Sequence, residues 1–286
     1  MKKNILILLS VVLLVAGYAF AESEVVFDNS YTDVDTGVVK DTYTGVLPNL
    51  SFGEADVIVQ DICSYTGSFL YLDEQKSAGD IQYYSTIDNS TNCKINRKTG
   101  DIFYRKYTDF DGPTPGLPTK KNAVALAKKH LKDLGLYKDK MGDPIVTTIE
   151  EAFFNGQITE RCEKTRVVTF TRKIGGIPVK GASRAVVMLG ANGDLDGLFV
   201  RWMDVKSEKV NGKIAKSQMK DFLKSQLKSR GEANSIRVKK SSLVFYDNGQ
   251  GVIEPALVVE GEITIDGGTF GSNWMFPILN DPKAEY

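Results

Sequence analysis

Few residues in this sequence of 286 residues have side chains suited to catalysis: one histidine, His130, and three cysteines, Cys63, Cys93 and Cys162. A single histidine excludes the paired-histidine zinc helix and metal sites built from several imidazoles. Cys162 next to Arg161 is a candidate nucleophile, but the sequence offers no recognisable base for it. We therefore expect no enzymatic activity, and a thiol-dependent enzyme is the weakest alternative.

The first 21 residues have the pattern of a secretory signal peptide. Lys2 and Lys3 precede the apolar run 5–16, and residues 19–21 form an A-x-A cleavage site before Glu22. An uncleaved membrane anchor is the alternative, but the apolar run is shorter than the roughly 20 residues that a span needs. We expect a secreted protein, periplasmic or extracellular, without stable membrane insertion after cleavage.

Export also changes how the cysteines are interpreted, because an oxidising compartment favours disulfides. We expect Cys63 and Cys93 to pair, although the sequence also allows Cys162 to pair with either of them. Acidic stretches at 33–37 and 109–112 contain parts of a calcium loop, but both lack its later oxygen ligands and its closing glutamate. Turns are the better interpretation, and we expect neither a metal nor a cofactor.

The charge of the chain is balanced overall but divided along its length. The sequence has 36 Lys and Arg against 36 Asp and Glu. Residues 22–118 carry 7 basic and 16 acidic side chains, whereas residues 119–286 carry 27 and 20. Prolines and glycines at 111–118 predict an extended linker at this boundary. Export and a net negative mature chain argue against nucleic acid as a partner, and the opposite charges predict that the halves dock.

The acidic region, residues 22–110, is predicted to be rich in β-strands. Runs of Val, Ile, Phe, Leu and Tyr predict short strands. These strands are expected at 55–62, 68–73 and 80–87. Residues 93–105 predict two further strands joined by a turn at Gly100.

The basic half predicts a helix followed by strands, twice. An apolar stripe between Thr119 and Gly135 predicts the first helix, and a second is expected at 216–228. Strands are expected at 145–154, 165–173, 179–189, 195–205, 236–246, 252–265 and 273–279. This order predicts an α+β fold in which an antiparallel sheet wraps a helix. Two such units in tandem, 119–210 and 211–286, would follow the β-rich N-terminal region.

The most informative motif lies between residues 168 and 200. It consists of an aromatic strand, a Gly-Gly turn, the segment GIPVKG, an apolar strand and an Asn-Gly turn. Its marker residues are Gly175, Gly176, Pro178, Gly181, Asn192 and Gly193. The arrangement resembles the propeptide domains of thermolysin-type and fungalysin-type secreted metalloproteases and the related PepSY domains. The resemblance covers residues 117–206 well and 213–280 more loosely, and its marker residues have mainly structural roles.

The resemblance implies a function without catalysis. Domains of this family help an attached zinc protease to fold and occupy its cleft, and free-standing copies restrain proteases or bind other exported partners. This sequence contains no HExxH motif and no attached peptidase. It is therefore expected to bind, and to inhibit or chaperone, a separate exported protein such as a zinc metalloprotease.

The second predicted helix carries a basic ridge, formed by Lys216, Lys220, Lys224 and Lys228. Residues four apart lie on one side of a helix, so the four ammonium groups would form a row opposite the apolar stripe. The ridge is a candidate binding surface for an acidic partner, and it supports an alternative function as an envelope structural or ligand-binding module. A solvated helix face is the simpler interpretation.

Overall fold

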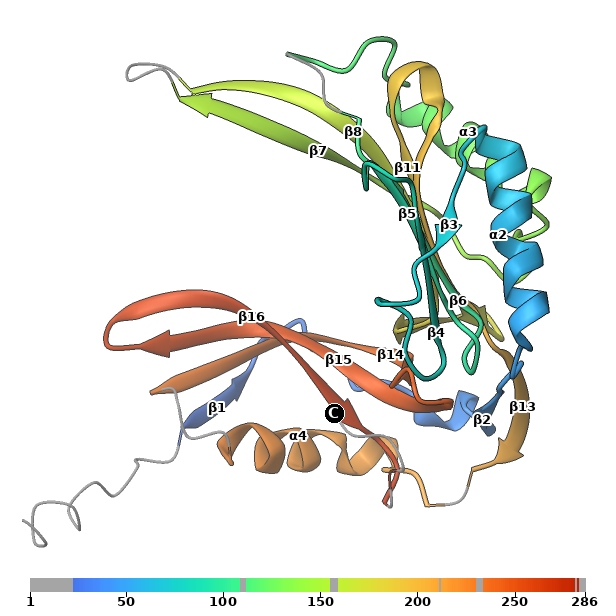
Figure 1. Ribbon diagram of the computed structural model, residues 1–286. Coiled ribbons are helices and arrows are strands. Elements are labelled where there is room, and N and C mark those ends of the chain that lie inside the picture. The colour runs from blue at the N-terminus through green and yellow to red at the C-terminus, as the bar shows by residue number, and fades with distance from the viewer. Residues whose placement is uncertain are drawn as a thin grey trace, which may run out of the picture.

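The computed structural model describes residues 23–108, 112–154, 159–210, 212–229, 234–280 and 282. The predicted signal peptide 1–21 and the acidic residues 109–111 lie outside these ranges. Within them the protein is an α+β fold made mostly of strands, with three α-helices and two sheets (Figure 1).

Both sheets have eight strands. The one with the larger buried core, called the large sheet, is curled into a half-barrel, and all its strand pairs are antiparallel (Figure 1). In spatial order its strands are β3 (Tyr71–Leu72), β4 (Ile81–Ser85), β5 (Thr91–Asn96), β6 (Asp101–Lys106), β12 (Leu195–Arg201), β11 (Arg184–Leu189), β8 (Thr159–Thr171) and β7 (Ile145–Phe154). The helices α2 (Phe52–Thr66) and α3 (Lys120–Asp133) cover its outer face (Figure 1). Their apolar sides form one core with the sheet, containing Ile62, Leu131 and Phe170.

The other eight-stranded sheet, called the small sheet because its buried core is smaller, is assembled from distant parts of the chain. Its strands are β13 (Asp204–Lys209), β2 (Asp41–Val46), β15 (Val252–Ile265), β14 (Ser235–Asp247), β10 (Ile177–Gly181) and β9 (Lys173–Ile174), with β1 (Glu24–Phe27) on β14 and β16 (Gly268–Pro277) on β15. Both β1 and β10 pair with β14 in parallel. The helix α4 (Met219–Lys228) covers one face, and short 3-10 turns stand at η1 (Thr36–Val38), η2 (Ala191–Gly193) and η3 (Lys216–Gln218).

The strand predicted at 55–62 is wrong, because this segment lies in the middle of helix α2. Ser51 caps the helix by accepting from the backbone N–H of Glu54, whose carboxylate accepts from Ser51 N in return. Ala55, Val59 and Ile62 are buried at helical spacing. The run of Val and Ile favoured a strand, but the reciprocal cap upstream of it determines the local structure.

Two predicted strands are each divided between the sheets. The predicted strand 179–189 becomes β10 and β11, and the predicted strand 195–205 becomes β12 and β13. The breaks lie at residues 182–183 and 202–203, where the chain passes from one sheet to the other. At the second break Trp202 and Met203 are themselves apolar, so periodicity alone could not show it.

The acidic and basic halves of the chain share both sheets. β6 pairs with β12, and β1 and β2 pair with strands of the basic half. The predicted linker 111–118 is attached to the large sheet, since Thr114 donates its hydroxyl to the Lys164 carbonyl and Arg166 donates to the Pro118 carbonyl. The N-terminal residues before position 55, which had no predicted role, supply two strands and a turn to the small sheet.

Candidate binding site

The inner face of the large sheet carries no helix. Side chains alternate between the two faces of a strand, and those packed against α2 and α3 include Val200, Val187 and Val168. Their strand neighbours therefore point to the opposite, helix-free face. The strand register aligns one row of that face, Phe103, Phe199, Val186, Thr169 and Ile145. We call this row, together with the neighbouring Arg184 and Arg201, the helix-free face.

Two arginines and an aromatic ring stack on the helix-free face. The guanidinium carbons of Arg184 and Arg201 lie 5.4 and 5.9 Å from the centre of the Phe199 ring. These arginines are direct cross-strand partners, an unfavourable pairing of like charges. Asp101 offsets it, because its Oδ2 accepts from Arg201 Nε at 2.7 Å. Arg184 is exposed, so this face offers a cation and a ring to a partner.

Strand β7 forms a free edge next to this face. Among the strands that the structure describes it pairs with β8 alone, and in Figure 1 it is the lower edge of the projecting β7–β8 hairpin. Its first five residues contain no charge, and Ile145 and Ile149 are 56% and 43% exposed. Sheet edges usually carry charges, prolines or bulges that prevent pairing with another chain. The register of the β7–β8 pair shifts only between Ile149 and Glu150, so the segment before this shift is an unprotected edge.

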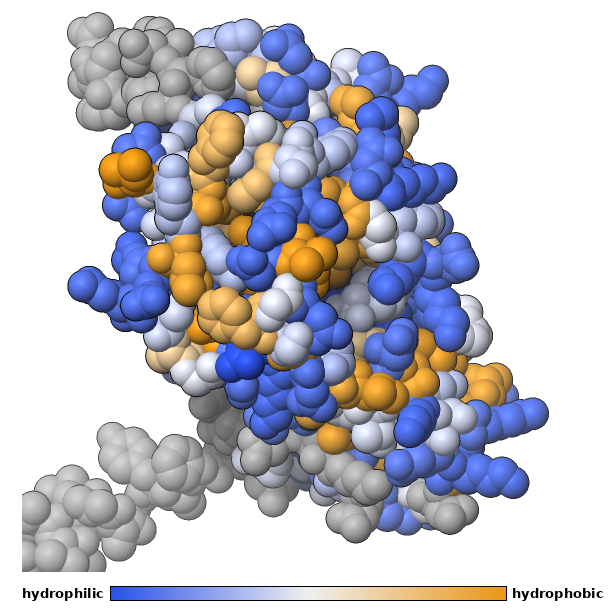
Figure 2. Space-filling model, turned by 45° about the vertical axis from the view of Figure 1, so that its right-hand side comes forward, coloured by the Kyte–Doolittle hydropathy of each residue, from blue (hydrophilic) through white to orange (hydrophobic). Residues whose placement is uncertain are grey.

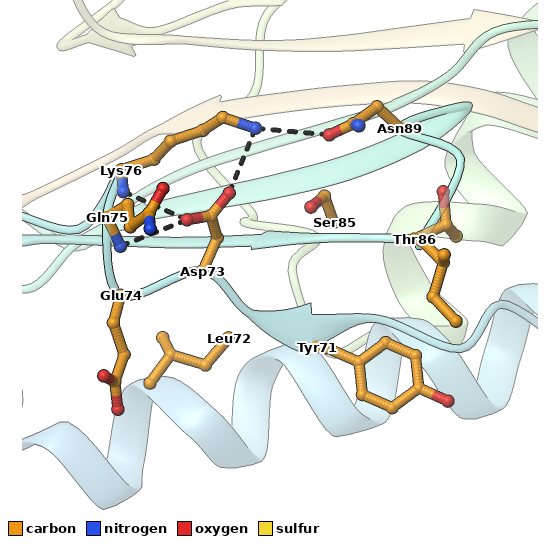
Figure 3. Close-up of a pocket in the computed structure, with 10 residues that line it drawn as sticks. Tyr71, Leu72, Asp73, Glu74, Gln75, Lys76, Ser85, Thr86 and Asn89 are labelled. Atoms are coloured by element: carbon orange, nitrogen blue, oxygen red, sulfur yellow. Dashed lines mark hydrogen bonds and ion pairs between the residues drawn. The ribbon is translucent and has the colours of Figure 1, made fainter.

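At the other end of the large sheet, the loops around β3 and β4 enclose an open cavity of about 550 Å³ (Figure 3). Asp73 and Lys76 form an ion pair of 3.0 Å there, and Lys76 Nζ donates to Asn89 Oδ1 at 3.2 Å. The hydrogen bond from Lys76 lowers the pKa of Asp73, with backbone N–H donors in the same turn contributing. These groups bind one another and stabilise the loop, so the cavity has no evident set of groups for a ligand.

His130 is a third candidate site, because both of its ring nitrogens lie close to other polar groups. Tyr65 Oη lies 2.8 Å from His130 Nδ1, and His130 Nε2 donates to the Gly193 carbonyl at 2.9 Å. Tyr65 Oη also lies 3.1 Å from Asp133 Oδ2. The residue is half-buried. Both ring nitrogens are engaged, so His130 joins α3 to α2 and to η2.

The marker residues of the predicted motif lie at turns and at a crossing between the sheets. Gly175 and Gly176 have φ of +57° and +83° in the turn between β9 and β10, which Pro178 follows. Gly181 has φ of +97°, and a Cβ there would overlap the Asp247 carbonyl oxygen of β14. At the other turn, Asn192 and Gly193 also have positive φ, +55° and +82°.

The four lysines of the basic ridge are all exposed, Lys216 in η3 and Lys220, Lys224 and Lys228 in α4. The ridge is not a uniform surface, however. Lys220 Nζ lies 5.6 Å from the ring centres of both Phe27 and Tyr31, so this side chain packs against the N-terminal segment. A partner surface on the remaining lysines stays a prediction.

The three cysteines are free thiols in the structure, so the predicted Cys63–Cys93 disulfide is absent from it. Cys63 on α2 and Cys93 on β5 nevertheless share the core of the large sheet. Burial raises the pKa of Cys93, and the charge of nearby Cys63 raises it further. Half-buried Cys162 lies on β8 opposite Glu151. The sequence thus identified two cysteines that the fold brings near each other.

Sequence reasoning did not find the helix-free face. Arg184, Phe199 and Arg201 come from two strands, and only the register of β11 and β12 places them together. The sequence of β11 is apolar after Arg184, so no alternation of polar and apolar residues marked the side chains that face away from the helices. Among the residues that the structure describes, no helix is long and apolar enough to cross a membrane. Within the same ranges, no three or more His, Cys, Asp or Glu side chains are grouped so that they could hold a metal ion.

Comparisons with known proteins give a likeness of fold. No known protein family and no curated protein sequence matches the chain. Seven chains of solved structures match it. One is the C-terminal domain of YpeB from Bacillus megaterium, with a TM-score of 0.41 and 17% sequence identity over 79% of this chain and 92% of that domain. The chain is thus structurally similar to this YpeB domain, and the likeness concerns the fold alone.

Proposed function

We propose that this protein is exported, has no catalytic activity, and binds an extended segment of another exported protein along strand β7. The observation that carries the proposal is the uncharged edge at residues 145–149, with Ile145 and Ile149 exposed. A peptide that pairs with β7 would satisfy the free backbone groups of the edge and extend the sheet. Its side chains would then continue the row that begins at Ile145 and leads to Phe199.

An exported zinc metalloprotease is the proposed partner, and inhibition or chaperoning of that enzyme the proposed outcome. The sequence motif between residues 168 and 200 supports this choice through its resemblance to protease propeptides. The same proposal interprets each sheet with its helices as one propeptide-like unit, α3 with the large sheet and α4 with the small one. Occupation of the protease cleft would use main-chain pairing for affinity and the exposed isoleucines for register.

The experiment measures inhibition of a thermolysin-type protease, with its binding to the purified protein as a second readout. Ile149→Lys places a charge on the edge and is expected to weaken binding at least tenfold. Val38→Lys is the matched control, because Val38 is 58% exposed but belongs to η1 rather than to an edge. Equal binding by the two variants would refute the role of β7. The absence of any effect on secreted proteases of the source organism would refute the partner.

A further inference from the structure

Two cavities meet where the chain crosses between the sheets. The inner cavity, of about 270 Å³, is lined mostly by apolar side chains from both sheets and from α2, including Leu50, Ile58 and Val200. The outer cavity, of about 350 Å³, lies beside β13 and is lined mainly by charged residues. Lys138, Trp202 and Asp204 line both, so the two cavities adjoin, and together they are called the junction cavity.

Arg172 in the outer part has an unsatisfied donor. Its side chain is 2% exposed, and its guanidinium carbon lies 5.4 Å from the centre of the Trp202 ring. Arg172 Nη1 donates to the Met203 carbonyl at 2.7 Å, whereas Nε has no partner among the residues that the structure describes. Burial lowers the pKa of Arg172, and the nearby carboxylates of Asp247 and Asp204 offset this only in part. A buried donor without a partner is costly, and an anion at this position would remove the cost.

The walls of the junction cavity change from charged to apolar along its length. Three cations, Lys138, Lys140 and Arg172, line the outer part with two carboxylates, Asp139 and Asp204, which leaves an excess of positive charge. The inner part offers aliphatic side chains and one face of Trp202. Thr99 Oγ1 on the inner wall is a second buried polar atom without a partner among the described residues. Few polar groups beside an apolar chamber are the usual features of small-molecule sites.

We infer that the junction cavity binds a carboxylate attached to an apolar group about the size of one aliphatic or aromatic side chain. The carboxylate lies near Arg172 and Lys138, where charge-assisted hydrogen bonds are strong. The apolar group lies against Trp202, Leu50 and Ile58. This chemistry occurs both in short fatty acids and at the C-terminal residue of a peptide. The inference is independent of the edge strand β7, which does not line the cavity.

The test uses Trp202 as its own reporter. The sequence has two tryptophans, so Trp274→Phe leaves Trp202 as the sole indole. This variant is titrated with octanoate and with N-acetyl-leucine, and with their neutral counterparts octanol and N-acetyl-leucinamide. The expected result is a saturable change in fluorescence with a carboxylate and at least tenfold weaker binding of its neutral counterpart. Tighter binding of octanoate would identify a fatty acid as the ligand, and tighter binding of N-acetyl-leucine would identify the C-terminal residue of a peptide.

Three variants then locate the ligand. Lys138→Met, at an exposed position, is expected to weaken carboxylate binding several-fold without affecting the neutral compounds, and Lys94→Met, outside the cavity, is its control. Ile58→Phe narrows the inner part and is expected to abolish all binding. Arg172→Met should remove the preference for the carboxylate. Because Arg172 also donates to the Met203 carbonyl, the melting curve of Arg172→Met is recorded. If Arg172→Met is unfolded, the result with Lys138→Met decides the test instead.

Two results would overturn the inference. One is the lack of any saturable response to either carboxylate up to millimolar concentration, which would mean that the cavity holds only water. The other is equal affinity for a carboxylate and its neutral counterpart, which would leave Arg172 without a ligand.

Discussion

Both sheets pack against helices, but their strands come from different parts of the chain. The strands of the large sheet come from one stretch, residues 71–201, and every neighbouring pair is antiparallel. The small sheet combines strands from both ends of the chain with β9 and β10 from the middle, and two of its pairs are parallel. Its order therefore depends on contacts between residues that are distant in sequence. This difference makes β14, which holds both parallel partners, the most vulnerable element.

The largest effect is expected at the crossing between the sheets. Gly181→Val adds a side chain at φ of +97° and places its Cβ against the Asp247 carbonyl, where β10 meets β14. We expect a loss of at least about 3 kcal/mol in the free energy of unfolding, or no folded protein. Gly175→Ala is the control, because its Cβ would have no neighbour within 4 Å and only the positive φ is unfavourable. Equal urea midpoints for the two variants would contradict this explanation.

The next largest effect should separate the two sheets. Val25→Asp places a charge in the core of the small sheet, where Val25 is 8% exposed in β1. We expect a loss of about 2–4 kcal/mol. Trp274 belongs to that core, so its fluorescence should report unfolding at lower denaturant than the large sheet does. Val26→Asp, at a position that is 44% exposed in the same strand, should have little effect. Simultaneous unfolding of both sheets would show that they are one cooperative unit.

A smaller, stabilising change is expected in the large sheet. Burial raises the pKa of Asp196, and the hydrogen bond from Thr108 opposes this only in part. Because the folded pKa lies above the unfolded one, the stability that Asp196 contributes is present at low pH and is lost as the pH rises through the folded pKa. Asp196→Asn should therefore raise the free energy of unfolding at pH 7 by on the order of 1 kcal/mol, which is measured as a higher melting temperature. The gain should be smaller near pH 4. Asp61→Asn, at an exposed position on α2, is the control for the loss of a surface carboxylate.

The smallest effect concerns the basic ridge on the small sheet. Lys220→Ala removes an ammonium group from the rings of Phe27 and Tyr31 and should cost about 0.5 kcal/mol. Lys224→Ala, one turn further along α4, should cost less. Both are measured by chemical unfolding at low and high salt. Identical losses would show that the contact with the N-terminal segment contributes nothing.

The sequence predicted the elements of the basic half well, because their signals are local. Thr119 caps α3 by accepting from the backbone N–H of Asn122, and the strands predicted at 236–246 and 252–265 are confirmed. The last strand, predicted at 273–279, begins earlier, at Gly268. The helix α2 was missed because β-branched residues concealed a cap formed by Ser51 and Glu54. The use of β1, β2 and β10 in the small sheet has no local signal, since pairing over such distances depends on the complete fold.

The candidate sites show the same limit. The glycines of the motif could be read from the sequence because positive φ is a local property that Gly tolerates. The row from Phe103 to Ile145 depends on the register of five strands. The contact of Arg172 with Trp202 depends on the crossing of the chain between the sheets. The lysine ridge was visible from helical spacing, but the contact of Lys220 with Phe27 joins residues that are far apart in sequence.

The position of β1 determines when this protein can finish folding. β1 begins at Glu24, close behind the predicted cleavage site, and its partner β14 begins at Ser235. During N-to-C synthesis, this first strand must wait for almost the whole chain before it can be paired. The large sheet can form in that interval, because its last strand in sequence ends at Arg201. The unpaired N-terminus is meanwhile exposed to aggregation and proteolysis, so completion of the small sheet marks the end of maturation.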